Sequence, residues 1–324
     1  MRLIRGLYNL RPEHKGSVAT IGNFDGVHRG HQAVIQQLKT EAERLNSTTT
    51  VITFEPLPQD FFLGKRAPSR LTPLRDKLIA FKKLGIDQVL CLPFNKKLAS
   101  LSANDFIQQV LVEGLGIKSL VVGDDFCFGK NRTGNFSLLQ QAGKKYGFEV
   151  QDTETFSEND VRISSSRIRT LLENGELHQA EQLLGRPYTM SGYVIEGDQR
   201  GREIGYPTAN IRVTRRVSPL RGIFVVEVNG IEDRPLPGVC SIGTRPTVNY
   251  RGFLIEVHLL DFTGDLYGKR LEVTWLKKLR NEEKFQSINE MVRQIERDEA
   301  DAREFFEKYI HRKDAESAKQ NKEK

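Results

Sequence analysis

The sequence predicts an α/β domain followed by a small antiparallel β-barrel, and three patterns along the chain indicate this. Up to about residue 185, short β-rich runs alternate with stretches whose apolar residues recur at helical spacing. This alternation is typical of a doubly wound, Rossmann-like parallel sheet with helices on both faces. From 191 to 276 it gives way to runs in which apolar and polar residues alternate. A helical pattern returns at about residue 283.

The first half contains the strands and helices of the predicted parallel sheet. Strands are expected at 17–22, 49–54, 88–92, 118–122 and 148–151, and helices at 31–45, 74–84, 103–114, 136–146 and 165–184. Ligands bind to such sheets at the carboxyl ends of the strands. The residues that directly follow a strand are therefore the first place to look for a functional site.

The second half has the turn and strand signals of an antiparallel barrel. Residues 223–230, IFVVEVNG, end in an Asn-Gly pair typical of a hairpin, and residues 254–260 and 271–275 also alternate. A helix from about 283 to 310 is expected to close the barrel, because its apolar residues recur every three or four positions and only Glu299 interrupts them. These apolar residues are Phe285, Ile288, Val292, Ile295, Ala302, Phe306 and Tyr309.

The pattern changes at Gly185-Arg-Pro-Tyr188, which predicts a domain boundary there. A chain of 324 residues is longer than one typical domain, so we expect a first domain at 1–185 and a second at 186–311. Residues 312–324 are charged and lack apolar periodicity, and disorder is the simplest expectation for them.

Composition and charge narrow the class of protein. Hydrophobic residues make up 38% of the chain and charged residues 28%, which is enough to bury an ordinary core in each domain. The net charge of +7 is compatible with nucleic acid, with anionic small molecules or with a merely basic surface. Because basic residues are interleaved with acidic ones and no nucleic-acid motif accompanies them, we expect no nucleic acid partner.

The N-terminal residues and the cysteines predict the compartment. The start, MRLIRGLYNLRPEHKG, is interrupted by charges every few positions, so neither a signal peptide nor a membrane partner is expected. Cys91, Cys127 and Cys240 lie far apart and form no C-x-x-C pair. This favours the reducing cytoplasm and argues against a disulfide framework or structural zinc. Haem is not expected either, and the sequence leaves the oligomeric state open.

The stretch Ile21–His31, IGNFDGVHRGH, places three glycines and two of the six histidines between a predicted strand and a predicted helix. Unpaired backbone N–H groups at a helix start carry the positive end of the helix dipole and favour an anion. No G-x-x-x-x-G-K-[ST] or G-x-G-x-x-G motif is present, and no Cys or third His lies near His28 and His31 in the sequence to complete a metal site. We therefore favour two imidazoles that hold the phosphates of a nucleotide. A glycine turn with purely structural histidines is the alternative.

Two further polar motifs follow a predicted strand or open a predicted helix. Gly123–Gly129, GDDFCFG, follows the strand at 118–122 and is expected on the same sheet edge as the histidine motif. In it, Asp125 is a candidate contact for substrate or magnesium, or a simple turn cap. Ile163–Arg169, ISSSRIR, offers serines and arginines at a helix start, and arginine can bind phosphates bidentately. The alternative for this motif is an N-cap followed by a solvated basic face.

Together these motifs resemble a known family. Gly22–His31 fits G-x-F-D-G-x-H-x-G-H and resembles the bacterial branch of the H-x-G-H nucleotidylyltransferases, in which the other two motifs occur in the same order. Gly205–Asn210, GYPTAN, is similar to the riboflavin kinase motif. The chain therefore resembles the bacterial bifunctional riboflavin kinase/FAD synthetases over nearly its whole length before the tail.

The resemblance implies two reactions with ATP as co-substrate and Mg²⁺ as cofactor. The C-terminal domain is expected to phosphorylate riboflavin to FMN, leaving ADP. The N-terminal domain is expected to join FMN to the AMP part of ATP, giving FAD and pyrophosphate. In this step the FMN phosphate, with a second pKa of about 6, is the nucleophile and needs no general base. The enzyme must instead neutralise the negative charge of the phosphates. His28 and His31 can do so, because an imidazole can donate hydrogen bonds to a phosphate and can be cationic beside it.

The resemblance also implies which residues act in adenylyl transfer. His28 and His31 are expected to be catalytic, and Asp25 is expected to orient the site or to cap the helix. The residues expected to bind ATP are Gly22, Asn23, Phe24, Asp25, Gly26, Gly30, Asp125, Ser164, Ser165, Ser166, Arg167 and Arg169.

A proline-rich stretch is expected to shape the flavin site of the first domain. Thr53–Pro58, TFEPLP, corresponds to a family stretch T-F-x-P-H-P, so Phe54, Pro56 and Pro58 are expected to line the flavin or nucleotide. Leu57 stands where the family has histidine, which removes a direct polar role at this position.

The second domain carries the kinase residues. Gly201 and Gly205 belong to a glycine-bearing loop expected to close over phosphates. Thr208 and Asn210 place two oxygens on one face of an extended segment, and the resemblance implies that they bind Mg²⁺ together with ATP. Arg280 and Phe285 are expected to cover the isoalloxazine ring.

Glu256 is the candidate general base. On its strand it shares a face with His258, opposite Ile255, Val257 and Leu259, and a solvated outer face is the alternative interpretation. The resemblance makes Glu256 the catalytic base. A base is useful because the riboflavin hydroxyl is a poor acid, with a pKa comparable to about 15.7 for water.

Other functions fit the sequence less well. The nearest is a nucleotidylyltransferase for another phosphorylated metabolite, with a barrel that only binds ligand. A class I tRNA synthetase also carries an H-x-G-H element, but the chain has no K-M-S-K-S sequence and no anticodon-sized domain. From a different class, a basic, non-catalytic nucleotide- or RNA-binding protein would lose nucleic acid when the salt concentration is raised modestly.

Overall fold

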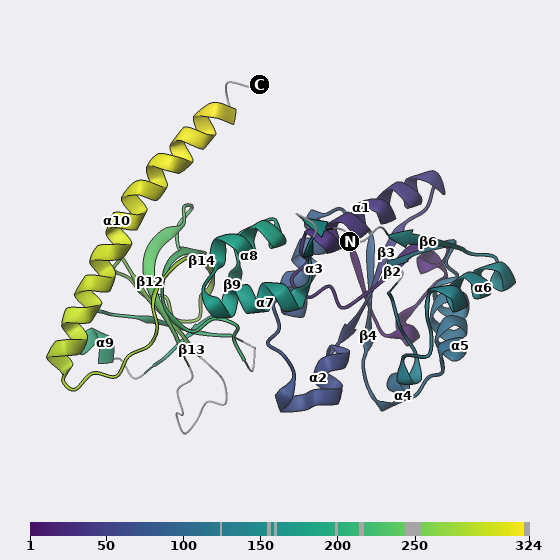
Figure 1. Ribbon diagram of the computed structural model, residues 1–324, viewed down its shortest axis with the longest axis horizontal. Coiled ribbons are helices and arrows are strands. Elements are labelled where there is room, and N and C mark those ends of the chain that lie inside the picture. The colour runs from purple at the N-terminus through teal and green to yellow at the C-terminus, as the bar shows by residue number, and fades with distance from the viewer. Residues whose placement is uncertain are drawn as a thin grey trace. The chain divides into compact units, whose positions relative to one another are not determined.

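The computed structural model describes residues 1–123, 125–153, 157–158, 161–197, 200–213, 217–243 and 254–320 (Figure 1). The chain divides into two compact units, Met1–Ser165 and Ser166–Lys324. Among the described residues, no helix combines the length and the apolar composition that crossing a membrane requires.

The first unit is built on a six-stranded parallel sheet, as the sequence predicts. Its strands are β1 (Arg2–Arg5), β2 (Val18–Ile21), β3 (Thr49–Glu55), β4 (Gln88–Pro93), β5 (Ser119–Gly123) and β6 (Glu149–Thr153). They are ordered β1-β4-β3-β2-β5-β6, and all neighbouring pairs are parallel. The chain moves outward from β2 to β3 and β4 on one side and to β5 and β6 on the other. The carboxyl ends of β2 and β5 are therefore the switch point at which such sheets bind ligands.

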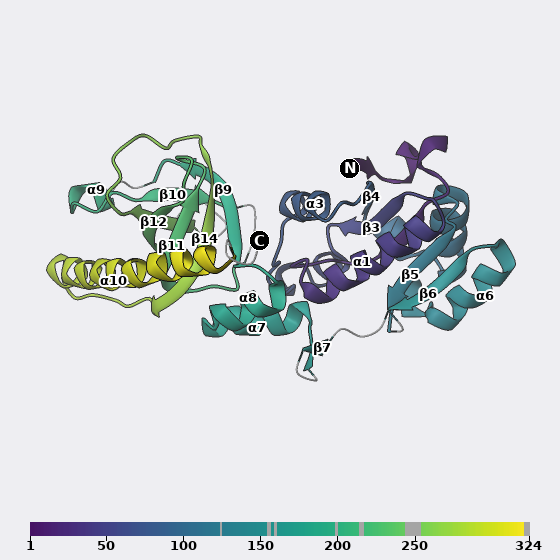
Figure 2. The same ribbon diagram turned by 90° about the horizontal axis from the view of Figure 1, so that it is seen from above.

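Helices cover both faces of this sheet, which confirms the doubly wound architecture. On one face, Ile35 and Leu38 of α1 and Phe81 of α3 pack on Val18 and Val51. On the other face, a second core joins the strands to the segment 103–115 and to α6. Figure 2 shows α1 lying along the sheet. The helices are α1 (Arg29–Arg44), α2 (Pro58–Leu63), α3 (Leu74–Lys83), α4 (Lys96–Ala99), α5 (Ala103–Phe106), the π-helix η4 (Ile107–Leu115) and α6 (Phe136–Tyr146).

Several short elements differ from the sequence expectation. Strand β1 escapes prediction because two of its four residues are arginines. The expected helix at 165–184 is two helices, α7 (Ser165–Asn174) and α8 (Leu177–Leu184), because Gly175 takes a φ of +80° that ends the first. The remaining short elements are η1 (Leu7–Asn9), η2 (Pro12–His14), η3 (Gly64–Arg66), η5 (Lys130–Arg132), β7 (Ser157–Glu158) and β8 (Val161–Arg162).

The second unit contains the predicted small antiparallel barrel. Its strands close in the order β10-β13-β12-β11-β14-β9, and every neighbouring pair is antiparallel. The expected hairpin after Asn229 joins β11 to β12, with Val228 opposite Leu236 and a φ of +98° at Gly230. The strands are β9 (Thr189–Ile195), β10 (Ala209–Arg212), β11 (Gly222–Asn229), β12 (Leu236–Gly243), β13 (Leu254–Leu259) and β14 (Arg270–Arg280), and a short helix α9 covers Arg200–Glu203.

The closing helix α10 (Ile288–Gln320) packs on the barrel through Ala302 and Phe306 (Figure 1). It begins later than the expected residue 283, because Ser287 Oγ accepts the backbone N–H of Glu290 at 3.2 Å and so caps the helix. At its other end it extends through residue 320, where disorder is expected from the sequence. The tail residues are rich in Ala, Glu, Lys and Gln, which favour helix without an apolar stripe. Residues 321–324 lie outside the described part of the chain.

Candidate active sites

The turn from Gly22 to His28 joins β2 to α1 at the switch point of the sheet. His28 is the N-cap of α1, and its Nδ1 accepts the backbone N–H of His31 at 3.4 Å. Phe24 and Val27 have φ values of 48° and 43°, a region that residues with large side chains rarely adopt. Each such position costs on the order of 1–3 kcal/mol and persists only where the surroundings impose it.

A cavity of about 330 Å³ opens beside this turn. It is lined by residues from all three polar motifs of the first domain, which lie at 21–31, 123–129 and 163–169 in the sequence. The two glycine motifs therefore share one sheet edge, as predicted. The lining residues are Thr20, Ile21, Gly22, Phe24, His28, Gly30, His31, Val34, Val122, Gly123, Asp125, Phe126, Thr153, Ile163, Ser164 and Ser165.

The two imidazole rings of the cavity stack on each other. The ring centroids of His28 and His31 lie 3.6 Å apart with 18° between the ring planes. Burial, and then the nearby positive groups of His28 and Lys77, hold the pKa of His31 well below its ordinary value. His31 is therefore neutral at pH 7 in this structure. Its buried Nδ1 has no hydrogen-bond partner among the described residues.

Two glycines of the cavity lie close to neighbouring side chains. A Cβ atom on Gly30 would lie 3.3 Å from the His28 ring, and one on Gly123 would lie 3.0 Å from Oδ1 of Asp125. A side chain at either position would require the neighbouring side chain to move by a few tenths of an ångström.

Within the turn, three residues expected to bind ATP do not line this cavity: Asn23, Asp25 and Gly26. The buried Asp25 carboxylate instead accepts the backbone N–H groups of Leu71 and Thr72 at 3.0 Å. Its own carbonyl oxygen accepts the Ser165 hydroxyl at 2.8 Å. Asp25 therefore ties the turn to two other segments of the chain, and its expected role in orienting the site stays a prediction.

The third motif is divided between the two units. Ser164 and Ser165 line the cavity. Ser166, Arg167 and Arg169 lie on α7 in the second unit and are not among the lining residues. Their contact with phosphate stays a prediction.

An aromatic cluster surrounds the expected flavin stretch. The rings of Phe54 and Phe94 meet edge to face at 5.7 Å, and Phe61 and Phe62 of α2 lie 5.5 and 5.7 Å from Phe94. Phe62 is 64% exposed. The Phe61-Phe62 pair, three residues beyond Pro58, is the sequence signal that would have added these rings to the site.

The last three residues of the proline stretch, Pro56–Pro58, have one buried and two accessible side chains. Pro56 is exposed and Pro58 is half-buried, whereas Leu57 is only 4% exposed. The backbone N–H of Leu57 donates to Asp60 Oδ2 at 3.3 Å. Leu57 therefore contributes to the core and has no polar role, in agreement with the sequence.

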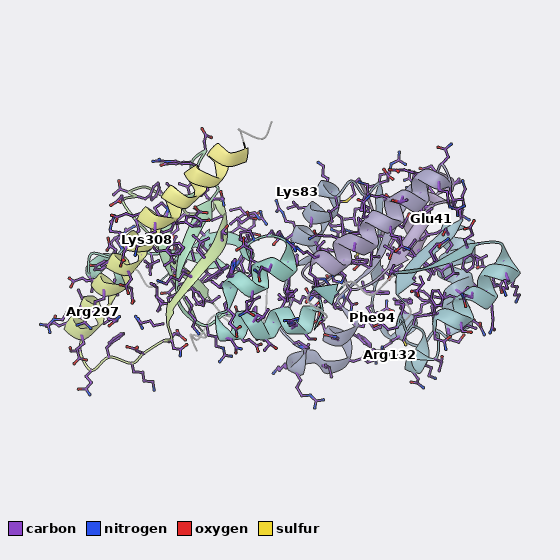
Figure 3. All side chains as sticks on the ribbon, turned by 45° about the horizontal axis from the view of Figure 1, so that its top comes forward. Glu41, Lys83, Phe94, Arg132, Arg297 and Lys308 are labelled. Carbon is purple, nitrogen blue, oxygen red and sulfur yellow. The ribbon has the colours of Figure 1, made fainter. Side chains whose placement is uncertain are left out.

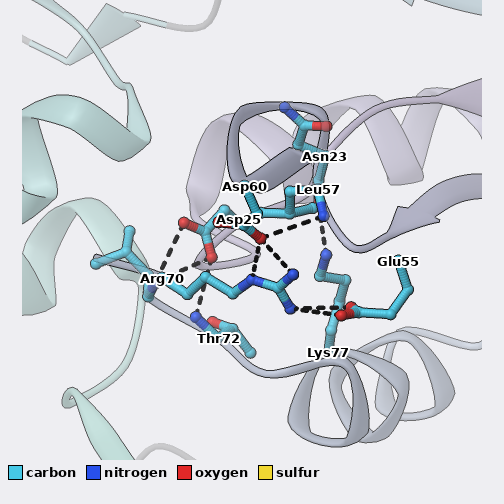
Figure 4. Close-up of polar contacts among 9 residues, drawn as sticks. Asn23, Asp25, Glu55, Leu57, Asp60, Arg70, Thr72 and Lys77 are labelled. Atoms are coloured by element: carbon cyan, nitrogen blue, oxygen red, sulfur yellow. Dashed lines mark hydrogen bonds and ion pairs between the residues drawn. The ribbon is translucent and has the colours of Figure 1, made fainter. Parts of the chain in front are cut away.

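A charged network behind the turn was not anticipated from the sequence (Figure 4). Arg70 donates to both carboxylate oxygens of Glu55 at 2.9 Å and to Asp60 at 2.6 Å. Lys77 Nζ donates to the carbonyl oxygen of Asn23 at 2.6 Å. Lys77 lies on the apolar face of the helix predicted at 74–84. A lysine at such a position is the sequence signal that could have pointed to this contact.

In the barrel, the strand register brings two predicted residues together. Asn210 on β10 lies directly opposite Glu256 on β13, and Ser241 on β12 lies opposite Glu256 on the other side. Facing pairs on antiparallel strands have Cβ atoms about 4.5–5.5 Å apart. Neighbouring Ile255 and Val257 are buried, whereas Glu256 is partly exposed, so the predicted division of faces is confirmed.

The GYPTAN segment is held against β13. His258 Nδ1 lies 2.9 Å from the carbonyl oxygen of Pro207 and so carries the ring proton, because a carbonyl only accepts. The Tyr206 ring stands edge-on to His258 at 5.3 Å. Thr208, the residue after Pro207, is exposed.

The glycine-bearing loop folds back on the same segment. The backbone N–H of Tyr206 donates to the Gly201 carbonyl at 2.7 Å, and a Cβ atom on Gly201 would collide with the Tyr206 carbonyl. Gly205 takes a φ of +87°. Residues 198–199 of this loop lie outside the described residues.

Arg280 is engaged with the closing helix. Its guanidinium donates to both carboxylate oxygens of Asp298, at 2.9 and 2.7 Å, and Asp298 is 4% exposed. The Phe285 ring lies 5.8 Å from the Arg280 guanidinium, ahead of the first turn of α10. The strongest contacts of Arg280 are therefore structural.

Comparison with known proteins identifies both halves of the chain. Residues 10–167 match the sequence model of the FAD synthetase family, and residues 184–306 match that of the riboflavin kinase family. The chain is 51% identical over 307 residues to the bifunctional riboflavin kinase/FMN adenylyltransferase of Escherichia coli K12, covering 94% of this chain and 98% of that protein. The corresponding protein of Pseudomonas fluorescens is 47% identical over 313 residues, covering 96% of this chain and 100% of that protein.

A solved structure shares the arrangement of elements. The crystal structure of a protein named as a macrolide-efflux protein from Streptococcus pneumoniae matches with a TM-score of 0.80 and 29% identity, over 94% of this chain and 99% of that one. That name belongs to the other protein. For this chain the match shows a shared architecture over nearly the full length.

A parallel α/β unit with an H-x-G-H turn, joined to a riboflavin kinase barrel, defines a two-domain enzyme of flavin nucleotide synthesis. The chain belongs to the family of bifunctional riboflavin kinase/FMN adenylyltransferases. Its FAD synthetase part is N-terminal and its riboflavin kinase part is C-terminal.

Proposed function

We propose that FMN is adenylylated in the cavity beside His28 and His31, and that riboflavin is phosphorylated around Asn210 and Glu256. The observation that supports the first site is that three separate motifs line one cavity at the N-terminus of α1. A helix N-terminus with histidines and serines suits a phosphate-rich substrate.

In adenylyl transfer, an oxygen of the FMN phosphate attacks the α-phosphorus of ATP, and the bond to the bridging oxygen breaks to release pyrophosphate. His28 and His31 donate hydrogen bonds to the α-phosphate and the leaving group. His31 is neutral in the free site, and the negative phosphates favour its protonated form when ATP binds. Ser164, Ser165 and the following residues Ser166, Arg167 and Arg169 bind the β- and γ-phosphates.

The flavin of the first site stacks on the aromatic cluster. The isoalloxazine ring is flat and aromatic, and the exposed Phe62 ring together with Phe61 and Phe94 offers a matching apolar surface. Pro56 and Pro58 border this surface, and Phe54 supports it from below as part of the core.

In riboflavin phosphorylation, Glu256 accepts the proton of the riboflavin hydroxyl, whose oxygen attacks the γ-phosphorus of ATP and displaces ADP. The hydroxyl of Thr208 and the side-chain oxygen of Asn210 hold Mg²⁺, and Gly201 and Gly205 approach the phosphates. Hard oxygen ligands of this kind fit Mg²⁺ when ATP and water complete the shell. The ion supplies charge neutralisation at the phosphates. Arg280, fixed by Asp298, keeps Phe285 in place over the isoalloxazine ring.

We also propose the cytoplasm as the compartment. Cys91, Cys127 and Cys240 are all free thiols, which suits reducing conditions. The proposed partners are the small molecules riboflavin, FMN, FAD, ATP, ADP and pyrophosphate. We propose neither a nucleic acid nor a membrane as a partner.

We place the functional boundary between 185 and 186. The FAD synthetase match ends at 167 and the riboflavin kinase match begins at 184. A fragment that starts at Gly185 should fold and form FMN but no FAD. A second fragment that starts at Ser166 keeps α7 and α8 and should be assayed beside it. Because α8 packs on β14, this comparison shows whether the barrel needs α8 to fold.

One assay tests both sites. The purified protein is incubated with riboflavin, ATP and Mg²⁺, and FMN and FAD are followed by chromatography. Sequential appearance of FMN and then FAD is expected. If His31→Ala still forms FAD at the wild-type rate, the proposed adenylyl-transfer site is wrong.

A further inference from the structure

Helix α3 supports the catalytic turn from behind with two side chains one turn apart. Lys77, which is 1% exposed, donates from Nζ to the Asn23 carbonyl at 2.6 Å. The Phe81 ring stands edge-on to Phe24 at 5.4 Å, and the Phe24 ring lies 5.0 Å from that of His31. A continuous chain of contacts therefore runs from α3 through the turn to His31.

The turn depends on such support because its backbone is strained at Phe24 and Val27. Its carbonyl groups are held one after another by side-chain donors. Ser165 Oγ donates to the Asp25 carbonyl at 2.8 Å, and Gln32 Nε2 donates to the Val27 carbonyl at 2.9 Å. Lys77 is the donor at the Asn23 carbonyl, the point where the chain leaves β2, and it is the one of these three donors that can carry a charge.

The pKa of the Lys77 amine is lowered on balance, chiefly because the amine is buried, while nearby carboxylates oppose that shift. Burial lowers the pKa of Lys77, and Arg70 acts in the same direction, whereas the carboxylates of Asp25 and Glu55 raise it. Arg70 is itself paired with Glu55 and Asp60 (Figure 4). The buried amine therefore sits between an acidic network and the catalytic turn.

We propose that Lys77 is a positioning residue for adenylyl transfer, which holds the Asn23 carbonyl and thereby the turn that presents His28 and His31 to the cavity. This inference rests on the proposed role of the two histidines. Lys77 does not line the cavity, so it acts through the turn and not on the substrate.

A second consequence distinguishes this role from simple packing. The positive charges that lower the pKa of His31 are His28, on the N-terminus of α1, and Lys77, on α3. The acidic side chain among the residues that line the cavity is Asp125, after β5. Removal of the Lys77 charge should therefore raise the pKa of His31.

The test is Lys77→Met, which removes the amine but keeps a side chain of similar length. The matched control is Lys83→Met on the same helix, where the lysine is exposed (Figure 3). For both full-length variants, kcat and KM of FMN adenylylation, the riboflavin kinase rate and the NMR titration of the histidine Cε1 protons are measured.

The Lys77→Met protein should lose roughly a hundredfold in adenylylation kcat, as expected for displacement of catalytic groups by about 1 Å. Its kinase rate should stay within about twofold of wild type, and one histidine should titrate at higher pH. Lys83→Met should match wild type in every measurement.

Three outcomes would overturn the inference. They are wild-type adenylylation by Lys77→Met, a rise in KM at unchanged kcat, and an NMR spectrum showing that the sheet unit has unfolded. His31→Ala, assayed in parallel, separates this inference from the proposed function. If it loses FAD formation while Lys77→Met does not, only the role of Lys77 fails.

Discussion

Asn210 and Glu256 face each other across the β10–β13 pair of the barrel. One is the predicted ligand of Mg²⁺ and the other the predicted proton acceptor. Because their Cβ atoms are direct neighbours on one face, a phosphoryl group bound near Asn210 lies within reach of a hydroxyl bound by Glu256. The register of two strands thus brings together residues 46 positions apart, which sequence motifs alone leave unconnected.

Glu256→Gln should reduce kcat of the riboflavin kinase by roughly 10²–10⁴, because glutamine keeps the shape but accepts no proton. FMN adenylylation should be unchanged. The control is Glu232→Gln, at an exposed position in the turn after β11. A kinase kcat at the wild-type level would rule out the base assignment, and a rise in riboflavin KM alone would indicate uniform binding instead.

His28→Ala and His31→Ala should each slow adenylyl transfer by about 10²–10³, as the loss of one preorganised donor to a developing negative charge does. FMN should accumulate, because the barrel is untouched. His178→Ala, which changes an exposed histidine on α8, serves as the control. The measurement is the FMN to FAD ratio by chromatography, and an unchanged ratio in the double variant would contradict the assignment.

Five of the six strands of the parallel sheet, the barrel and the shared sheet edge of the two glycine motifs could be predicted, because they depend on local patterns. Buried runs such as Val18–Ile21 and the glycines of the first turn carry their signal within a few residues. The contacts that hold the histidine turn in place could not be predicted. Lys77 meets Asn23 across 54 positions and Asp25 meets Leu71 across 46, and no local propensity encodes either contact. The end of α7 was missed for the opposite reason, since the local Asn174-Gly175 signal was outweighed by the apolar pattern on both sides.

The free energy of unfolding of the first unit should fall as the pH is lowered below about 6.5, the ordinary pKa of histidine. The unfolded chain takes up a proton on His31 there, whereas the folded chain, in which the pKa of His31 is well below that value, does not. The slope should approach about 1.4 kcal/mol per pH unit until the folded pKa is reached, and it should vanish above neutral pH.

This dependence is measured by urea unfolding of wild type and His31→Gln between about pH 5 and pH 7.5, followed by far-UV circular dichroism. The single tryptophan, Trp275, lies on β14, so its fluorescence reports the barrel and serves as an internal control. In the His31→Gln protein, the free energy of unfolding followed by circular dichroism should depend less on pH than in wild type. The pH dependence of the transition followed by Trp275 fluorescence should be the same in both proteins. Parallel pH dependences in both proteins would contradict the neutral state of His31.

Asp298→Asn should destabilise the barrel, because it leaves the Arg280 guanidinium partly buried beside a group that no longer balances its charge. The side chains of Arg280 and Asp298 are 15% and 5% exposed, and removal of one partner from such a buried pair costs about 3–5 kcal/mol. The expected result is an earlier Trp275 transition in urea, with Asp301→Asn on the exposed face of α10 as the control. The double variant Arg280→Met/Asp298→Leu should recover much of the loss, since two apolar side chains leave no unpaired charge. If Arg280 acted on flavin alone, Asp298→Asn would leave the transition where it is in wild type and change only the KM for riboflavin.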